Sequence, residues 1–242
     1  MNSALNIFCL PFAGGNKYSY RDYKEIAPSF INFISLEYPG RGARIKEPLI
    51  SDTHALVNDL YNKIAQNIDD CDYAIYGHSL GGLVAYLLTR KLIENNHKPP
   101  VHLFISGTTG PSSASRGEKK RHLLPKPDFI QELKDLHGMP DEILENDDLL
   151  DYYEPILRSD FKASEVYVYK NDDPLDIPIT VITGTEEDME IADIELWQKE
   201  TTQTVDFKRL PGNHFFIYNH AQAIIRIISK KLLANTKVYH YE

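Results

Sequence analysis

Residues 72–95 place a buried strand pattern directly before a buried helix pattern. The segment "DYAIY" (72–76) is short and apolar, as in a strand that is covered on both faces. The segment "LGGLVAYLLTRKLIEN" (80–95) is long and rich in leucine, as in a helix that packs on a sheet. Only three residues join the two segments, so the chain must turn sharply between them. This pattern favours a parallel strand followed by a covering helix.

The same alternation continues along the chain. Further strand patterns occur at 6–12, 31–38, 101–107, 179–184 and 204–210, and further helix patterns at 18–28, 52–68 and 219–233. Strands that alternate with helices predict an α/β fold with a mostly parallel, doubly wound sheet. The length of 242 residues suits one such domain with room for an insertion.

Residues 111–170 interrupt this alternation. They begin with a loop rich in Ser, Lys and Arg, and they reach a strand-like run, "EVYVY" (165–169), only at their end. Helical patterns between these points cover 127–137, 140–146 and 147–158. We interpret 111–170 as a helical lid inserted into a core formed by 1–110 and 171–242. The alternative is a plain additional helical layer.

Composition excludes several classes of protein. A net charge of −9 argues against non-specific nucleic-acid binding, which needs clustered basic residues. No run of about 18 apolar residues predicts a membrane span, and the N-terminal run is better interpreted as a strand than as a signal peptide. We therefore expect a cytoplasmic protein with no membrane or nucleic-acid partner. Cys9 and Cys71 are expected to be buried, unpaired thiols, and no zinc-binding spacing occurs.

The turn between strand and helix carries the pattern Gly77-His78-Ser79-Leu80-Gly81. A serine on a sharp strand-to-helix turn is held out of the core, and glycines two residues before and after it give the clearance that the turn needs. Such a serine becomes a nucleophile when a base removes its proton. With a strand before it and a helix after it, Ser79 is predicted to be that nucleophile rather than a structural serine.

Two places offer backbone donors for a developing oxyanion. The helix after Ser79 begins at Leu80, where backbone N–H groups lack intrahelical acceptors. The loop "PFAGG" (11–15) follows the first strand, and its glycines allow a close approach of the backbone. We expect the N–H of Leu80 and that of Phe12 or Ala13 to form an oxyanion hole. The alternative for the loop is an ordinary turn.

The base should lie late in the chain, because the expected order is serine, acid, histidine. Among nine histidines, His214 directly follows the last strand and the loop "PGN", where a parallel sheet forms its sites. The acid should follow the strand at 179–184, in the loop "GTEEDME". Its candidates are Glu186, Glu187, Asp188 and Glu190. Asp188 has the commoner side chain for the role, and glutamate is a permitted substitute.

Several motifs together resemble the type II thioesterases of nonribosomal peptide and polyketide synthesis, which are α/β-hydrolases. The resemblance covers almost the whole chain. It rests on "FCLPFAGG" (8–15), "EYPGRG" (37–42), "YGHSLGG" (76–82), the segment 122–161 with its "GMP" and "PILRSD", "GTEED" (184–188), Trp197 and "PGNHFFI" (211–217). By this resemblance Ser79 is the nucleophile, His214 is the base, and the amides of Phe12 or Ala13 and of Leu80 form the oxyanion hole.

The resemblance implies hydrolysis of acyl thioesters on the phosphopantetheine arm of acyl or peptidyl carrier protein domains, which clears misprimed or stalled groups. It implies no metal and no cofactor, since the pantetheine belongs to the substrate. The alternatives are an esterase or lipase of small oxygen esters, a medium-chain fatty acyl-carrier-protein thioesterase, and an inactive hydrolase fold that serves as a binding module. We expect a monomer.

Two departures from the family pattern affect the site. Asn213 stands where the family usually has a second glycine before the histidine, and asparagine tolerates left-handed backbone better than most residues. The family acid usually stands three residues after the strand-end glycine, which selects Glu187 counted from Gly184. The spacing from Glu187 to Trp197 also fits. Asp188 needs a shift of one residue but has the usual side chain, so both carboxylates remain candidates, with a slight preference for Asp188.

Two further expectations concern the lid. Its apolar side chains would shape a channel for the acyl group or pack only against one another: Phe129, Leu133, Leu136, Met139, Ile143, Leu149 and Leu150. The basic run "RGEKKR" (116–121) would contact an acidic carrier protein or would remain a solvated loop.

Overall fold

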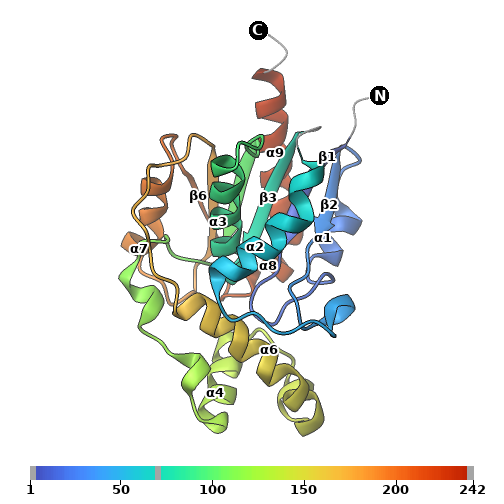
Figure 1. Cartoon of the computed structure of the whole chain (residues 1–242), viewed down its shortest axis with the longest axis vertical. Coiled ribbons are helices and arrows are strands. Elements are labelled where there is room, and N and C mark those ends of the chain that lie inside the picture. Colours follow the sequence, from blue (N-terminus) through green and yellow to red (C-terminus); the bar gives the residue numbers. More distant parts are fainter. Residues whose placement is uncertain (1–3, 69–71, 239–242) are drawn as a thin grey trace.

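A six-stranded parallel sheet forms the centre of the molecule in the computed structural model, which describes residues 4–68 and 72–238 (Figure 1). The strands are β1 (Leu5–Leu10), β2 (Ile31–Ser35), β3 (Tyr73–His78), β4 (His102–Ser106), β5 (Ile179–Gly184) and β6 (Asp206–Leu210). They are arranged in the order β2-β1-β3-β4-β5-β6, and every neighbouring pair is parallel. The predicted α/β fold with a doubly wound parallel sheet is confirmed.

Helices cover both faces of this sheet (Figure 1). One face carries α2 (Thr53–Ile64) and α3 (Leu80–Glu94), and the other carries α1 (Arg21–Ile26) and α9 (Ala221–Val238). The remaining core helices are the short α7 (Ile191–Glu195) and α8 (Phe216–Asn219). Each face has its own cluster of buried side chains, because successive residues of a strand point to opposite sides of the sheet.

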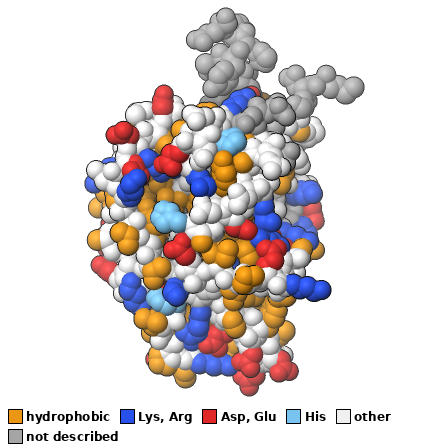
Figure 2. Space-filling view, viewed as in Figure 1, with side chains coloured by type: hydrophobic (Ala, Val, Ile, Leu, Met, Phe, Trp, Pro, Cys, Tyr) orange, Lys and Arg blue, Asp and Glu red, His pale blue; other side chains and the backbone are white. Residues whose placement is uncertain are grey.

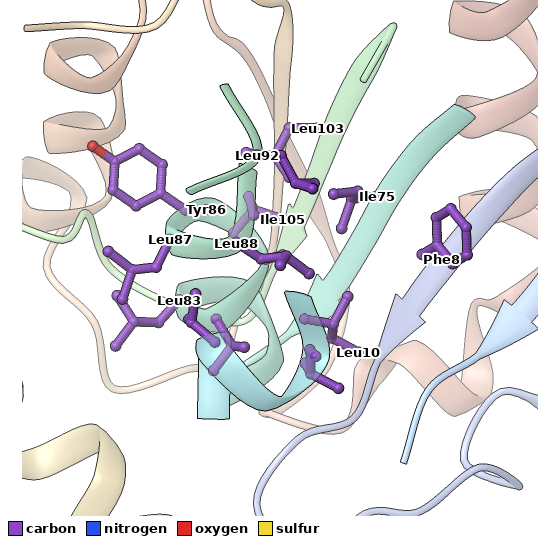
Figure 3. Packing of buried hydrophobic residues seen from close by; sticks show 14 of the residues in the cluster. Phe8, Leu10, Ile75, Leu83, Tyr86, Leu87, Leu88, Leu92, Leu103 and Ile105 are labelled. Carbon is purple, nitrogen blue, oxygen red and sulfur yellow. The ribbon is translucent and has the colours of Figure 1, made fainter. Parts of the chain in front are cut away.

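Helix α3 is apolar around almost its whole circumference because it is enclosed on most sides. Eleven of its residues are buried. Figure 3 shows its leucines, among them Leu88 and Leu92, lying against Ile75 of β3 and Leu103 of β4. Burial of this kind contributes about 1.5–3 kcal/mol for each large aliphatic side chain. The helix therefore holds the turn at its N-terminus firmly against the sheet.

The segment 111–170 is helical and lies beyond the carboxyl ends of the strands (Figure 1). It contains short 3₁₀ turns, α4 (Lys126–Leu136), α5 (Asp141–Leu144) and α6 (Asp147–Glu165). These helices have a hydrophobic cluster of their own, built from Phe129, Leu133, Leu144, Leu150 and Leu157. The predicted helical patterns are confirmed, although α6 continues seven residues beyond the predicted end at 158.

The strand predicted at 165–169 is wrong. Helix α6 continues to Glu165, and none of the described residues pairs with 166–170 in a ladder. Val166 and Val168 are exposed, so the alternating pattern does not mark a strand with one buried face. The buried Glu165 carboxylate instead accepts hydrogen bonds from the backbone N–H groups of Arg121 and His122, which fixes the end of the helix.

Strand order creates a switch point between β1 and β3. The chain leaves β1 toward β2 on one side of the sheet and leaves β3 toward β4 on the other. Leu10 pairs with Gly77, so the two strands end side by side and the loops that follow them diverge from one point. Ligands of open parallel sheets bind at such crevices. Two of the predicted site segments, 11–15 and the turn at Ser79, therefore begin here.

Cys9 is buried in β1 as a free thiol, and Cys71 lies outside the described residues. In the ranges 4–68 and 72–238, every helix is too short or too polar to cross a lipid bilayer.

Candidate active site

Ser79 occupies a strained turn between β3 and α3. Its backbone has a φ of 56° and a ψ of −120°, a conformation that side chains other than glycine rarely adopt. The Ser79 N–H donates to the carbonyl of Ser106 at 2.8 Å, which ties the turn to the neighbouring strand β4. Strain of this kind persists only where the surroundings enforce it.

The glycines of the motif are required by close packing of backbone. A Cβ atom on Gly77 would stand 2.0 Å from the carbonyl oxygen of Gly81. A Cβ atom on Gly81 would stand 2.2 Å from the carbonyl oxygen of Leu10 in β1. Because both obstacles are backbone atoms, they cannot move aside. The spacing of glycines in the sequence therefore reflects how tightly the turn is pressed between β1 and α3.

The predicted oxyanion donors lie beside this turn. Phe12 and Ala13 follow β1, Leu80 begins α3, and these residues line the cavities that contain Ser79. In the described part of the chain, the backbone N–H groups of all three donate to no protein acceptor. These groups are thus available to a substrate oxygen, as a pre-organised oxyanion hole requires.

His214 and Glu187 form a hydrogen-bonded pair. The Nδ1 atom of His214 lies 2.6 Å from Oε1 of Glu187. The other oxygen, Oε2, accepts the backbone N–H of Gly184 at 2.6 Å, and the Glu187 side chain is only 3% exposed. A carboxylate held at both oxygens orients the imidazole and fixes the proton on Nδ1. This leaves Nε2 as the nitrogen that can act as a base.

Asp188 faces solvent at the edge of the larger cavity, whereas Glu187 bonds His214. Its side chain is 97% exposed, and its nearest cation is Lys119 at 3.6 Å. The slight preference for Asp188 therefore gives way to Glu187. The physical reason is local, because the Gly184 N–H at the end of β5 captures the side chain three residues later and turns it inward. Glu186 and Glu190 line the larger cavity described below and make no bond with His214.

His78, the residue before Ser79, lies directly beside His214. It is completely buried, and its Nδ1 lies 2.9 Å from Oγ of Ser106. Its ring centroid is 4.8 Å from that of His214. Burial, reinforced by the nearby His214, holds the pKa of His78 well below its ordinary value, so the ring stays neutral. His78 thus packs against His214 as an uncharged ring.

Two cavities meet at Ser79 and His214. The smaller is mainly apolar, has a volume of about 70 Å³, and is lined by Phe12, Ala13, Gly14, Ser79, Leu133, Leu136, Gly138, Met139, Leu157, Phe161, His214 and Phe215. The larger has a volume of about 680 Å³ and a polar lining with many charged side chains, among them Arg116, Lys119, Glu186 and Asp193. A reacting carbonyl at Ser79 can therefore extend in two chemically different directions.

Of the seven apolar side chains expected to shape a channel, three line the smaller cavity: Leu133, Leu136 and Met139. Phe129 and Leu150 pack within the cluster of the helical segment, Ile143 is half-buried away from the cavity lining, and Leu149 is 42% exposed. Helix α6 contributes Leu157 and Phe161, which the sequence did not single out. Their four-residue spacing on one helix face is the signal that would have found them.

A parallel sheet, a nucleophile turn after β3 and a histidine after its last strand define the α/β-hydrolase class. Comparison with known proteins narrows this class. The model of the thioesterase domain matches residues 6–232. The chain belongs to this thioesterase family, and it is a hydrolase of thioesters.

Three relatives illustrate the likeness. The gramicidin S biosynthesis protein GrsT of Aneurinibacillus migulanus is 33% identical over 96% of this chain and 91% of its own length. The medium-chain S-acyl fatty acid synthase thioesterase of Rattus norvegicus is 28% identical over 89% of this chain and 82% of its own. The crystal structure of ClbQ from the colibactin NRPS/PKS pathway matches with a TM-score of 0.91 and 30% identity. That match covers 98% of this chain and 100% of ClbQ.

Proposed function

We propose that this protein is a type II thioesterase that removes acyl groups from the phosphopantetheine arm of carrier protein domains in nonribosomal peptide or polyketide synthesis. The observation that carries the proposal is the meeting of two unlike cavities at Ser79 and His214. An acyl thioester has an apolar acyl end and a long polar pantetheine end, and these match the apolar and the polar cavity respectively. The likeness to GrsT and ClbQ supports the same assignment.

The residues of the site have the following roles in this proposal. His214 Nε2 removes the proton of Ser79 as the Oγ atom attacks the thioester carbonyl. Glu187 holds the imidazole and stabilises the imidazolium that forms. The backbone N–H groups of Leu80 and of Phe12 or Ala13 stabilise the oxyanion.

Collapse of the tetrahedral intermediate breaks the carbon–sulfur bond. The imidazolium of His214 gives its proton to the departing pantetheine thiolate, which leaves as the thiol, and Ser79 keeps the acyl group as an ester. Water then attacks this ester, with His214 again taking a proton and returning it to Ser79. Each step balances without a metal or a cofactor, and none is required in this proposal.

Residues 111–170 serve as the lid in this proposal, over a core of residues 1–110 and 171–242. The lid supplies Leu133, Met139 and Phe161 to the apolar cavity, and it covers the carboxyl ends of the strands (Figure 1). Exclusion of water by such a cover strengthens the hydrogen bonds to the oxyanion.

The basic run at 116–121 divides into two parts. Arg116 donates from Nε to the Gly110 carbonyl at 3.0 Å, and Arg121 pairs with Glu132 at 2.9 Å, so both are engaged within the protein. Lys120 is exposed, but its Nζ donates to the carbonyl of Glu165 at 3.0 Å. Lys119 is 54% exposed and lies 3.6 Å from the exposed Asp188, so it is the basic residue of this run that an acidic carrier protein can reach. Figure 2 shows that charged side chains of both signs are interspersed over one face of the molecule. We propose a monomeric, cytoplasmic enzyme whose partners are acyl or peptidyl carrier domains.

A medium-chain fatty acyl thioesterase is the second candidate, because the rat enzyme of that name is 28% identical. The size of the apolar cavity favours shorter groups. A volume of about 70 Å³ corresponds to roughly five to seven water-sized atoms. An acetyl, propionyl or butyryl group fits within that volume, whereas a chain of ten or more carbons would extend beyond it.

Parallel assays on matched substrates test the proposal. Carrier proteins loaded with propionyl and decanoyl groups are compared with oxygen esters of the same acids, and kcat/KM is measured for each. We expect the propionyl carrier thioester to be the best substrate and S79A to be inactive on all. A large preference for oxygen esters would overturn the proposal, and a preference for the decanoyl carrier would favour the second candidate.

A further inference from the structure

A buried ion pair joins the helical segment to the core beside the active site. Asp160 of α6 has no exposed surface, and Arg41, which follows β2, is 3% exposed. Arg41 Nη1 lies 2.5 Å from Oδ2 of Asp160, and Nη2 lies 2.7 Å from Oδ1. The contact is therefore a two-pronged one, with both charged groups removed from water.

This pair also holds the loop that contains Phe12 and Ala13. The backbone N–H of Gly14 donates to Oδ2 of Asp160 at 2.8 Å, and Arg41 Nη1 donates to the carbonyl of Gly15 at 3.3 Å. Gly14 has a φ of +77°, and a Cβ atom there would stand 2.5 Å from Leu157 of α6. The glycine loop is thus held by hydrogen bonds to Asp160 and Arg41 and by close packing against Leu157 of α6.

Stability alone is a weak reason for such a pair. Removing two charges from water is so unfavourable that an apolar pair of similar size is often at least as stabilising. A fork of two hydrogen bonds does, however, impose one geometry on its surroundings. An oxyanion hole depends on that property, because its donors must already point at the oxygen before charge develops.

We propose that Asp160, oriented by Arg41, is a positioning residue that fixes the loop at 11–15 and thereby the oxyanion donor at Phe12 or Ala13. This inference rests on the proposed function. Helix α6 also lines the apolar cavity through Leu157 and Phe161. The helix that contacts the acyl group in this account therefore also holds the backbone that stabilises the transition state.

The test uses D160N with T53V as a matched control. Asn keeps the size of Asp160, but its amide N–H₂ faces Arg41 in either orientation, and it also faces the Gly14 N–H if it takes the place of Oδ2. At least one bond is therefore lost. Thr53 Oγ1 donates to the carbonyl of Ala163, a second buried contact between the core and α6 that does not touch the glycine loop. Both variants are assayed on propionyl carrier protein, with activity expressed per Ser79 labelled by a fluorophosphonate.

We expect D160N to lower kcat by about 10- to 100-fold with KM changed by less than about threefold, as for a loss restricted to the transition state. The affinity for a trifluoromethyl ketone analogue, which forms a tetrahedral adduct with the serine, should fall by a similar factor. T53V should keep kcat within about threefold. An unchanged kcat in D160N overturns the inference. So does an equal loss in D160N and T53V, because it shows that the pair only docks the helix.

A second variant applies if D160N does not fold. R41K keeps the positive charge but loses the fork and the contact with Gly15, and we expect about a three- to tenfold loss in kcat with little change in KM. A kcat equal to that of the unaltered protein overturns the inference. Failure of the proposed function gives a different result, since the unaltered protein then shows no Ser79-dependent thioesterase activity.

Discussion

Glu187 is the residue whose replacement most sharply tests the arrangement of the site. Its Oε2 must accept the N–H of Gly184, so in E187Q the side-chain carbonyl oxygen takes that place. The amide N–H₂ group then faces Nδ1 of His214, where Oε1 lies at 2.6 Å in the unaltered protein. A donor in that position makes Nδ1 an acceptor and moves the imidazole proton to Nε2. His214 then presents a donor to Ser79 and cannot remove its proton.

The size of the effect follows from this exchange of tautomers. Amide replacement of the acid in a serine–histidine–acid site lowers kcat by about 10⁴-fold, which corresponds to about 5.5 kcal/mol in the activation free energy. We expect E187Q to lose about 10³- to 10⁴-fold in kcat on propionyl carrier protein, measured by release of the free thiol. D188N is the matched control, because the adjacent carboxylate is 97% exposed. It should stay within about twofold, as an exposed ion pair contributes little.

A thermal melt of E187Q should establish that the variant is folded, so that a loss of turnover reports on chemistry. If E187Q retained more than about a tenth of the activity, the wrong-tautomer argument would be refuted. If D188N lost as much as E187Q, the assignment of Glu187 as the orienting acid would be wrong.

Three further predictions concern specificity, packing and pH. Met139→Ala enlarges the apolar cavity, so the ratio of kcat/KM for octanoyl carrier protein to that for propionyl carrier protein should rise about tenfold. Leu149 does not line the cavity, so Leu149→Ala should leave this ratio unchanged. Gly77→Ala places a Cβ 2.0 Å from a backbone oxygen, so it should lower the free energy of unfolding in urea titrations by about 3 kcal/mol or more. At Gly117 a Cβ would have no atom nearer than 3.7 Å, so Gly117→Ala should leave the free energy of unfolding nearly unchanged. Burial lowers the pKa of His102 to about 3, so the folded protein keeps this ring neutral while the unfolded chain protonates it below its ordinary pKa. The contribution of the neutral His102 ring to the free energy of unfolding is therefore present above about pH 6.5 and is lost as the pH falls toward 3. As the pH is lowered from about 7 to 5, the free energy of unfolding measured in urea should fall by about 2 kcal/mol more in the unaltered protein than in His102→Gln.

The sequence predicted those parts of the fold that depend on local pattern. The strands around 72–76 and 179–184 are short, apolar and bounded by turn residues. The helix pattern at 52–68 begins at Asp52, whose side chain caps α2 by accepting the N–H of Ala55, a role typical of aspartate. The strand predicted at 165–169 failed because β-branched and aromatic residues favour a strand only when a neighbouring strand is present. No local pattern reports that neighbour.

The site shows the same division. Ser79 and His214 were identifiable because each follows a strand at a position that the chain order defines. The sequence did not decide between Glu187 and Asp188, because that choice depends on the Gly184 N–H, which binds one of two adjacent carboxylates. The contact between Arg41 and Asp160 joins residues 119 positions apart, and only the folded structure brings them together.

The central claim is that Ser79 carries the acyl group of a carrier-bound thioester during turnover. Mass spectrometry tests it most directly, on a panel of carrier proteins loaded with acetyl, propionyl, aminoacyl and longer acyl groups and sampled before and after addition of the enzyme. We expect loss of the short acyl groups from the carrier, an acid-quenched intermediate with the acyl mass on the peptide that contains Ser79, and neither event with S79A. Deacylation that persists in S79A, or an acyl mass on another residue, would contradict it.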